Sequence, residues 1–93
     1  LNAPLAPADV SVQFVMRSKN AEVSWRDVSN NESSFLVERS TNGSTFAPLG
    51  SVSANQTLFT DSSAQPKTQY YYRVRALNSA GSNVSPAVPL KTR

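Results

Sequence analysis

The strongest constraint on the fold is the run Tyr70–Ala76, in which inward and outward positions alternate residue by residue. The set expected to face a core is Tyr70, Tyr72, Val74 and Ala76, and the set expected to face outward is Tyr71, Arg73 and Arg75. A period of two is typical of a β-strand with one buried face, and no part of the chain repeats convincingly with the period of a helix. The sequence therefore predicts an all-β fold.

Shorter segments show the same alternation and are separated by clusters of Gly, Pro, Asn, Asp and Ser. Together with the run above they predict seven strands, around residues 10–14, 21–25, 35–39, 46–52, 57–60, 70–76 and 88–90. Proline cannot donate to a sheet ladder, so Pro48 indicates that the fourth strand is an edge strand, and Pro86 and Pro89 indicate the same for the last. Between the third and fourth strands, Asn42-Gly43 predicts a tight turn with positive φ at both positions.

Seven short strands without a helix favour two antiparallel sheets packed as a sandwich, although periodicity alone also fits a small barrel. The chain of 93 residues has the length of one domain. We expect residues 1–7 to be a proline-containing linker and residues 8–93 to be the domain. Because the chain has no cysteine, only its core supports the fold. The predicted core residues are Trp25, Phe35, Val37, Phe59, Tyr70, Tyr72 and Val74.

The sequence offers few of the residue types that catalysis and metal binding use. It has no His and no Cys, so the usual bases, nucleophiles and soft metal ligands are missing. Asp27 and Glu32 flank one loop and come nearest to a cation site, but their spacing does not resemble a calcium loop. We expect no catalytic residue, no cofactor and no dedicated metal.

The charge and hydropathy of the chain indicate which classes of partner it is not expected to bind. The net charge is +3 and dispersed, without a basic stripe interleaved with aromatic residues, so we expect no nucleic-acid partner. No segment reaches the roughly 20 apolar residues of a membrane helix, so we expect no membrane insertion.

Several segments carry a resemblance to a known family. They are Pro4 and Pro7, Trp25, Phe35–Arg39, Pro66–Asn78 and Ala80–Ser82. In these residues the chain resembles the fibronectin type III family over nearly its whole length. The resemblance implies a seven-stranded, immunoglobulin-like β-sandwich. It also implies a tyrosine corner, in which the ring of Tyr70 packs in the core and its hydroxyl bonds to backbone a few residues upstream.

Two positions depart from the pattern of that family. Ala64 stands where a leucine is usual, two residues before the corner proline Pro66, and this removes an apolar contact. Asp61 stands where the fifth strand usually carries an inward aliphatic residue. We expect Asp61 to bond turn backbone, with a strand end frayed toward solvent as the alternative. The runs 57–61 and 70–75 are most similar to fibronectin type III domains of secreted bacterial modular proteins.

The outward residues of the sixth strand should lie beside those of the third, because these strands are neighbours in the family fold. The resulting candidate partner surface is Leu36, Glu38, Tyr71, Arg73 and Arg75. The favoured interpretation is cross-strand packing with Glu38 paired to Arg73 or Arg75, which contributes about 0.2–1 kcal/mol. The alternative is a partner surface, since Tyr and Arg are enriched at interface hot spots.

These observations predict a non-catalytic spacer and protein-interaction module of a larger extracellular or cell-surface protein, whose parent chain can itself be an enzyme. Its partners are the neighbouring domains of that chain, and the isolated module should be monomeric. One alternative is a module that binds a polysaccharide or a cell-surface protein. Another is a repeat of an intracellular structural array.

The tyrosine corner can be tested by changing Tyr70→Phe. If the hydroxyl satisfies a buried partner, its loss should lower the free energy of unfolding by about 1–3 kcal/mol. Denaturant titration of the variant beside the unchanged chain measures this difference. Equal stability of the two proteins would contradict the assignment.

Overall fold

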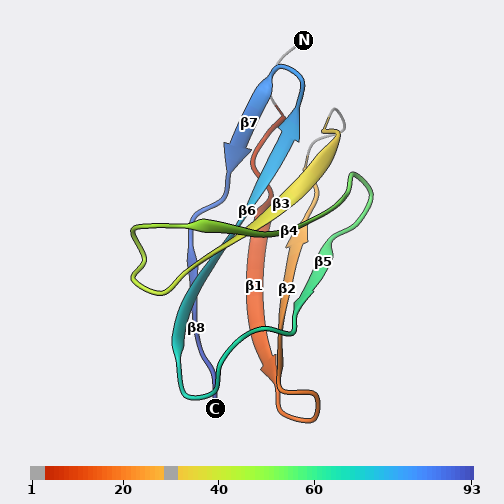
Figure 1. The fold of residues 1–93 in the computed structure, drawn as a ribbon. Helices are drawn as coiled ribbons and strands as arrows, with labels where there is room; N and C mark the ends of the chain where they lie inside the picture. The colour runs from red at the N-terminus through yellow and green to blue at the C-terminus, as the bar shows by residue number, and fades with distance from the viewer. Residues whose placement is uncertain (1–3, 29–31) are drawn as a thin grey trace.

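The computed structural model describes residues 4–28 and 32–93, which form two layers of antiparallel strands (Figure 1). The described residues contain no helix, so none is long and apolar enough to cross a membrane. The strands are β1 (Ala8–Val15), β2 (Asn20–Arg26), β3 (Ser34–Ser40), β4 (Ala47–Ser53), β5 (Leu58–Asp61), β6 (Gln69–Asn78), β7 (Gly81–Val84) and β8 (Val88–Lys91).

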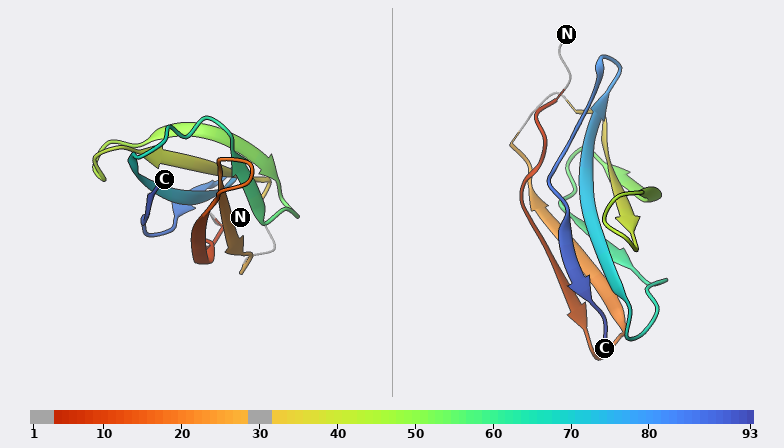
Figure 2. Two further views of the ribbon diagram at one scale, coloured as in Figure 1. Left: turned by 90° about the horizontal axis from the view of Figure 1, so that it is seen from below. Right: turned by 90° about the vertical axis from the view of Figure 1, so that its left-hand side faces the viewer.

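The strands divide into two sheets that face each other (Figure 2). One sheet has the order β1-β2-β5, and the other has the order β4-β3-β6-β7, with β8 also pairing with β6. All pairings are antiparallel. The predicted all-β sandwich is therefore confirmed, and β4, which contains Pro48, lies at an edge of its sheet.

The described residues form eight strands where the sequence predicts seven, because residues 81–84, between the predicted sixth and last strands, form strand β7. The break between β7 and β8 falls at Ser85. Its amide donates to the carbonyl of Val74 at 2.9 Å, and its Oγ accepts from the amide of Val74 at 3.0 Å. A side-chain oxygen thus takes the place of a backbone carbonyl in the ladder. Pro86, which has no amide proton, follows directly and ends the regular pairing.

The core lies between the inner faces of β2, β3 and β6. Buried side chains of these strands are Ala21, Val23, Trp25, Phe35, Val37, Tyr70, Tyr72, Val74 and Ala76. The rings of Trp25 and Phe35 pack across the two sheets with centroids 5.4 Å apart. Phe59 of β5 is half-buried, and its ring covers Gly50 of β4 so closely that a Cβ there would lie 2.6 Å away. The two sheets therefore meet tightly at this edge.

The turn prediction for Asn42-Gly43 is only half right. Gly43 has a φ of 78°, but Asn42 does not adopt a positive φ, because the connection between β3 and β4 is a six-residue loop. The side chain of Asn42 instead accepts from the amides of Ser44 and Thr45, both at 2.9 Å. Ser40 Oγ accepts from the amides of Asn42 and Gly43. Side-chain oxygens therefore shape this loop.

The two ends of the described chain lie at opposite ends of the long axis of the molecule, which measures 43 Å (Figure 1). We call the end with residues 4–7, the end of β2 and the start of β3 the N-terminal pole. The C-terminal pole contains the β1–β2 turn, the β5–β6 connection and residues 92–93. Pro4 and Pro7 are buried, and Asn83 Nδ2 donates to the carbonyl of Pro4 at 2.7 Å. Residues 4–7 thus lie against the sandwich, and a linker boundary at residue 7 stays a prediction.

Candidate functional site

The first cluster of polar side chains lies on the solvent side of the larger sheet, which we call the outer face. The five residues of the candidate partner surface all lie there. Across β3 and β6, Glu38 stands opposite Arg73, Leu36 opposite Arg75 and Ser40 opposite Tyr71. Directly opposed residues of an antiparallel pair project to the same side, so the register brings this set together.

Glu38 joins both arginines of the outer face. Arg73 Nε donates to its Oε1 at 2.6 Å, and Arg75 Nε donates to its Oε2 at 3.2 Å. The Glu38 side chain is only 11% exposed, so burial acts to raise its pKa. The hydrogen bonds and charges of Arg73 and Arg75 outweigh burial and hold the pKa of Glu38 below its ordinary value. Glu38 is therefore shared by two arginines within the domain.

Phe46, which the sequence reasoning missed as part of this face, covers Arg73. The guanidinium of Arg73 lies 4.0 Å from the centroid of the Phe46 ring, in cation–π geometry. The ring of Tyr71 lies against Gly43, where a Cβ would stand 3.5 Å from it. The β3–β4 loop therefore folds back along the outer face. No sequence pattern indicated this path, because it depends on how Ser40 and Asn42 bond the loop.

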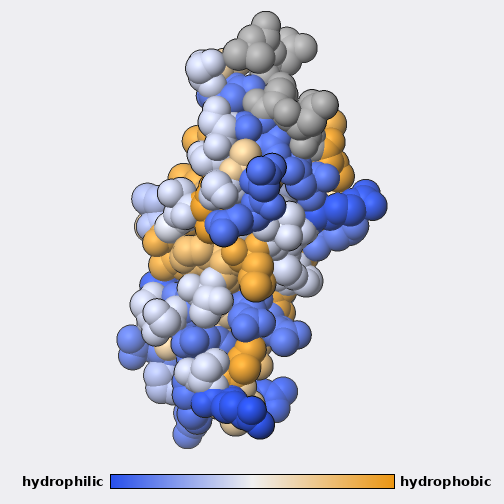
Figure 3. All heavy atoms as spheres, turned by 90° about the vertical axis from the view of Figure 1, so that its right-hand side faces the viewer, coloured by the Kyte–Doolittle hydropathy of each residue, from blue (hydrophilic) through white to orange (hydrophobic). Residues whose placement is uncertain are grey.

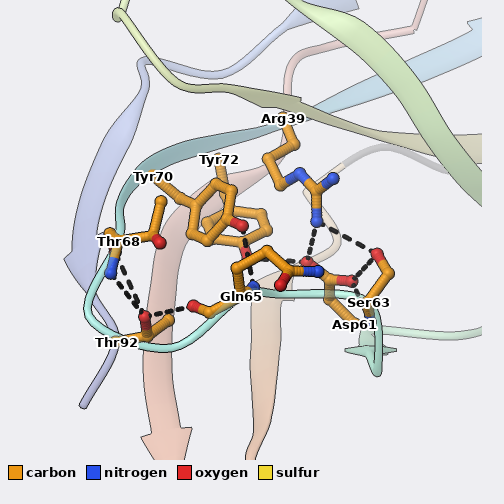
Figure 4. A network of polar contacts seen from close by, with 8 residues as sticks. All are labelled: Arg39, Asp61, Ser63, Gln65, Thr68, Tyr70, Tyr72 and Thr92. Carbon is orange, nitrogen blue, oxygen red and sulfur yellow. Dashed lines mark hydrogen bonds and ion pairs between the residues drawn. The ribbon is translucent and has the colours of Figure 1, made fainter.

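A second cluster surrounds Asp61 inside the C-terminal pole (Figure 4). The side chain of Asp61 is 1% exposed and accepts four hydrogen bonds. Tyr72 Oη at 2.7 Å and Arg39 Nη1 at 2.8 Å donate to Oδ2. The amide and the hydroxyl of Ser63 donate to Oδ1 at 3.0 and 2.7 Å. Asp61 thus bonds turn backbone as expected, and the alternative of an end frayed toward solvent is wrong.

These contacts decide the protonation state of the cluster. Burial acts to raise the pKa of Asp61, but the hydrogen bonds from Tyr72, Ser63 and Arg39 outweigh it and lower the pKa below its ordinary value. Burial and the neighbouring carboxylate of Asp61 raise the pKa of the Tyr72 hydroxyl far above its ordinary value. At neutral pH the cluster therefore contains an ionised Asp61 and a neutral Tyr72.

Arg39 is the residue of this cluster that the sequence reasoning did not identify. It shares the inward side of β3 with Phe35 and Val37, and its guanidinium lies 4.7 Å from the centroid of the Tyr70 ring. Its bond to Asp61 of β5 connects the two sheets. The clue was in the sequence, because Arg39 and Asp61 are opposite charges that both fall on inward positions.

The tyrosine corner lies beside this cluster. The amide of Gln65 donates to Tyr70 Oη at 2.8 Å, and Tyr70 is 3% exposed. Thr92 Oγ1, at the end of the chain, accepts from the amide of Thr68 and donates to the carbonyl of Gln65 (Figure 4). The corner therefore also fixes the segment that follows β8.

Among the described residues, no group of three His, Cys, Asp or Glu side chains is placed to hold a metal ion. Trp25 is 6% exposed, so its ring is not available on the surface. A hollow of about 230 Å³ lies beside the β3–β4 loop and is lined by Arg39, Ser40, Thr41, Thr45, Ala47, Pro48 and Leu49.

The Asp61 cluster predicts a loss of stability in acid. Because folding lowers the pKa of the Asp61 carboxyl, the unfolded chain takes up a proton at higher pH than the folded one. The free energy of unfolding should therefore fall as the pH drops below about 4, the ordinary range of an aspartate. Asp61→Asn should make that fall shallower and cost about 2–4 kcal/mol at neutral pH, since it leaves Arg39 without its charge partner.

Denaturant titrations between neutral and acid pH measure both effects. Asp9→Asn is the matched control, because the Asp9–Arg26 pair has side chains 74% and 69% exposed and should matter little. An Asp61→Asn variant with the stability and acid response of the unchanged chain would contradict the role of the cluster.

Comparison with solved structures finds close matches in fold. The FN1–FN3 domains of chicken CNTN1 match with a TM-score of 0.82 and 25% identity, over 97% of this chain and 31% of that one. A Fn3-like protein from Clostridium thermocellum matches with a TM-score of 0.82 and 24% identity, over 99% and 96%. Domains A168–A170 of titin match with a TM-score of 0.79 and 26% identity, over 97% and 32%.

The chain thus spans about a third of the length of the CNTN1 and titin structures. None of the curated protein sequences gives a significant match. The model of the fibronectin type III domain matches residues 5–93. With this match over nearly the whole length and the same two-sheet sandwich, the chain belongs to the fibronectin type III family.

Proposed function

We propose that the domain is a non-catalytic spacer and protein-interaction module of a larger extracellular or cell-surface protein. The observation that carries the spacer role is the position of the two poles. A chain that enters at one end of a 43 Å sandwich and leaves at the other advances by the length of the domain (Figure 1). The extracellular setting is supported by the resemblance of runs 57–61 and 70–75 to secreted modular proteins.

A spacer must also be stiff, and the ends of this domain are tied by polar contacts. At the N-terminal pole, Asn83 bonds the carbonyl of Pro4. At the C-terminal pole, Thr92 bonds the corner and Asp61 joins the two sheets through Arg39 and Tyr72. Fibronectin type III domains occur as parts of multidomain chains, such as the CNTN1 and titin structures. A stiff unit of this kind holds its neighbours apart at a set distance.

The spacer role predicts a fixed distance between the two poles. Because the chain has no cysteine, Leu5→Cys and Arg93→Cys give two unique sites for fluorescent labels. Single-molecule energy transfer should give one narrow distribution of distances, set by the 43 Å axis. Leu5→Cys with Ala80→Cys is the control and should give a short distance, because Ala80 lies in the turn between β6 and β7, at the same end of the molecule as Leu5 (Figure 1). A broad distribution of distances between the labels at residues 5 and 93 would contradict the spacer role.

The interaction role concerns the outer face. Leu36, Tyr71 and Arg73 are half-exposed there, and Phe46 adds a second aromatic ring. A protein partner suits this face better than a polysaccharide. Sugar binding favours a strip of exposed aromatic rings, and the single Trp25 is buried. A repeat of an intracellular array remains the alternative for the setting of the domain.

A substitution at the centre of the outer face tests this role. Tyr71→Ala should weaken capture of partner proteins from the surface extract of the source cells at least several-fold, since hot-spot tyrosines contribute about 2 kcal/mol or more. Gln13→Ala, on the exposed side of the other sheet, is the matched control. Denaturation of both variants checks that the fold is intact. Equal capture by Tyr71→Ala and the unchanged domain would rule this face out.

A further inference from the structure

The outer face carries more positive than negative charge. Arg73 and Arg75 of β6 lie on it. Lys91 of β8 lies on the same side, because it stands opposite Gln69 and side chains two residues apart along β6 share a side. Glu38 is the only acidic residue in the described strands of this larger sheet. Three cations of these strands therefore face outward beside one carboxylate.

Arg73 is held in place, but the end of its guanidinium group is free. Its Nε donates to Glu38 Oε1 at 2.6 Å, and the guanidinium lies 4.0 Å from the centroid of the Phe46 ring. Neither Nη nitrogen of Arg73 has a hydrogen-bond partner among the described residues, and the side chain is 27% exposed. A guanidinium is a planar group with five N–H donors, so the two Nη groups present a fixed pair of donors to solvent.

Arg75 adds a second oriented guanidinium group. Its Nε donates to Glu38 Oε2 at 3.2 Å and its Nη1 donates to Ser82 Oγ at 2.9 Å, while Nη2 has no partner in the part of the chain that the structure describes. The side chain of Arg75 is 26% exposed. Tyr71, Arg73 and Arg75 follow one another on one side of β6 at a spacing of about 7 Å. The outer face therefore presents an aromatic ring and two cations in a row.

We propose that the partner of the outer face is an acidic segment of a protein, which places one carboxylate on the free Nη groups of Arg73. A carboxylate can accept two parallel hydrogen bonds from a guanidinium, which gives the contact both strength and orientation. In an extended segment the side chains on one side also repeat about every 7 Å, so a second acid can reach Arg75 and an apolar side chain can lie on Tyr71. This inference deepens the interaction role proposed above and rests on it.

A continuous polyanion suits this face less well than a protein segment. Glu38 is bonded by both arginines and is ionised at neutral pH, so it repels any phosphate or sulfate group that passes between them. The half-exposed side chains of Leu36, Tyr71 and Phe46 also offer apolar surface beside the cations. A nucleic acid or a sulfated polysaccharide carries charge at every unit, whereas a protein segment can alternate acidic and apolar side chains.

Two synthetic peptides test the chemistry of the partner. The first contains Glu-Ser-Glu-Ser-Leu, whose same-side residues in an extended chain match Arg75, Arg73 and Tyr71 in order, and the second contains Gln-Ser-Gln-Ser-Leu. Each peptide carries a fluorescent label, and its anisotropy at low salt measures binding to the domain. The acidic peptide should bind at least several-fold more tightly than the neutral one, and added salt should weaken its binding, because exposed charges are screened.

Substitutions test where the acidic peptide binds. Arg73→Gln should weaken its binding at least several-fold. Arg17→Gln is the matched control, because it removes the same charge from the exposed β1–β2 turn at the C-terminal pole, where hydrophilic side chains predominate (Figure 3), and it should leave binding unchanged. Glu38→Gln should tighten binding, because it removes the acid that competes for both arginines, whereas a mere disturbance of the fold would weaken it.

Denaturation must show that each variant is folded. If Arg73→Gln is not, Arg75→Gln replaces it and should also weaken binding. If Glu38→Gln is not, Ser51→Lys replaces it, because Ser51 is exposed and stands opposite Leu36 on the outer face, so that the added cation should also tighten binding.

Three results would overturn the proposal. They are equal binding of the two peptides, unchanged binding by the arginine variant, and tighter binding of single-stranded DNA or heparin than of the acidic peptide. The interaction role fails separately. If the acidic peptide does not bind but Tyr71→Ala still weakens capture of proteins from the surface extract, only the acidic chemistry of the partner is wrong.

Discussion

The bond network of Asp61 is the interaction on which the rest of this small sandwich depends. A carboxylate inside a domain is costly unless its oxygens are fully bonded and its charge is balanced. Here Tyr72, Ser63 and Arg39 do both, and they come from three separate segments. The bond to Arg39 connects the sheets where the aliphatic core ends. The network therefore specifies how the two sheets meet at the pole where the tyrosine corner also lies.

Much of the fold could be predicted from alternation alone, because a period of two fixes which side chains face inward. The same rule places Arg39 inward, yet its partner could be known only once β5 had been placed opposite β3. The bond between Tyr70 and the amide of Gln65 follows the family pattern. The break at Ser85 could not be predicted, because a hydroxyl that replaces a carbonyl leaves no periodic trace.

The outer face shows where sequence reasoning stops. Its register predicts that Glu38, Arg73 and Arg75 lie together, but not that one carboxylate joins both arginines. The loop that brings Phe46 over Arg73 depends on hydrogen bonds of Ser40 and Asn42, which are local and specific to this chain. Backbone pattern therefore determines which residues share a surface, and side-chain bonding determines what that surface offers to a partner.

The interrupted edge formed by β7 and β8 bears on solubility. An unbroken edge strand exposes a row of amide and carbonyl groups to which another chain can add a strand. In this domain Ser85, Pro86 and Ala87 interrupt that row, and Pro89 removes another donor. Pro48 does the same on the opposite edge strand, β4. These edges are thereby less able to pair with the edge strand of another chain, which lowers the tendency of the domain to aggregate through its sheets.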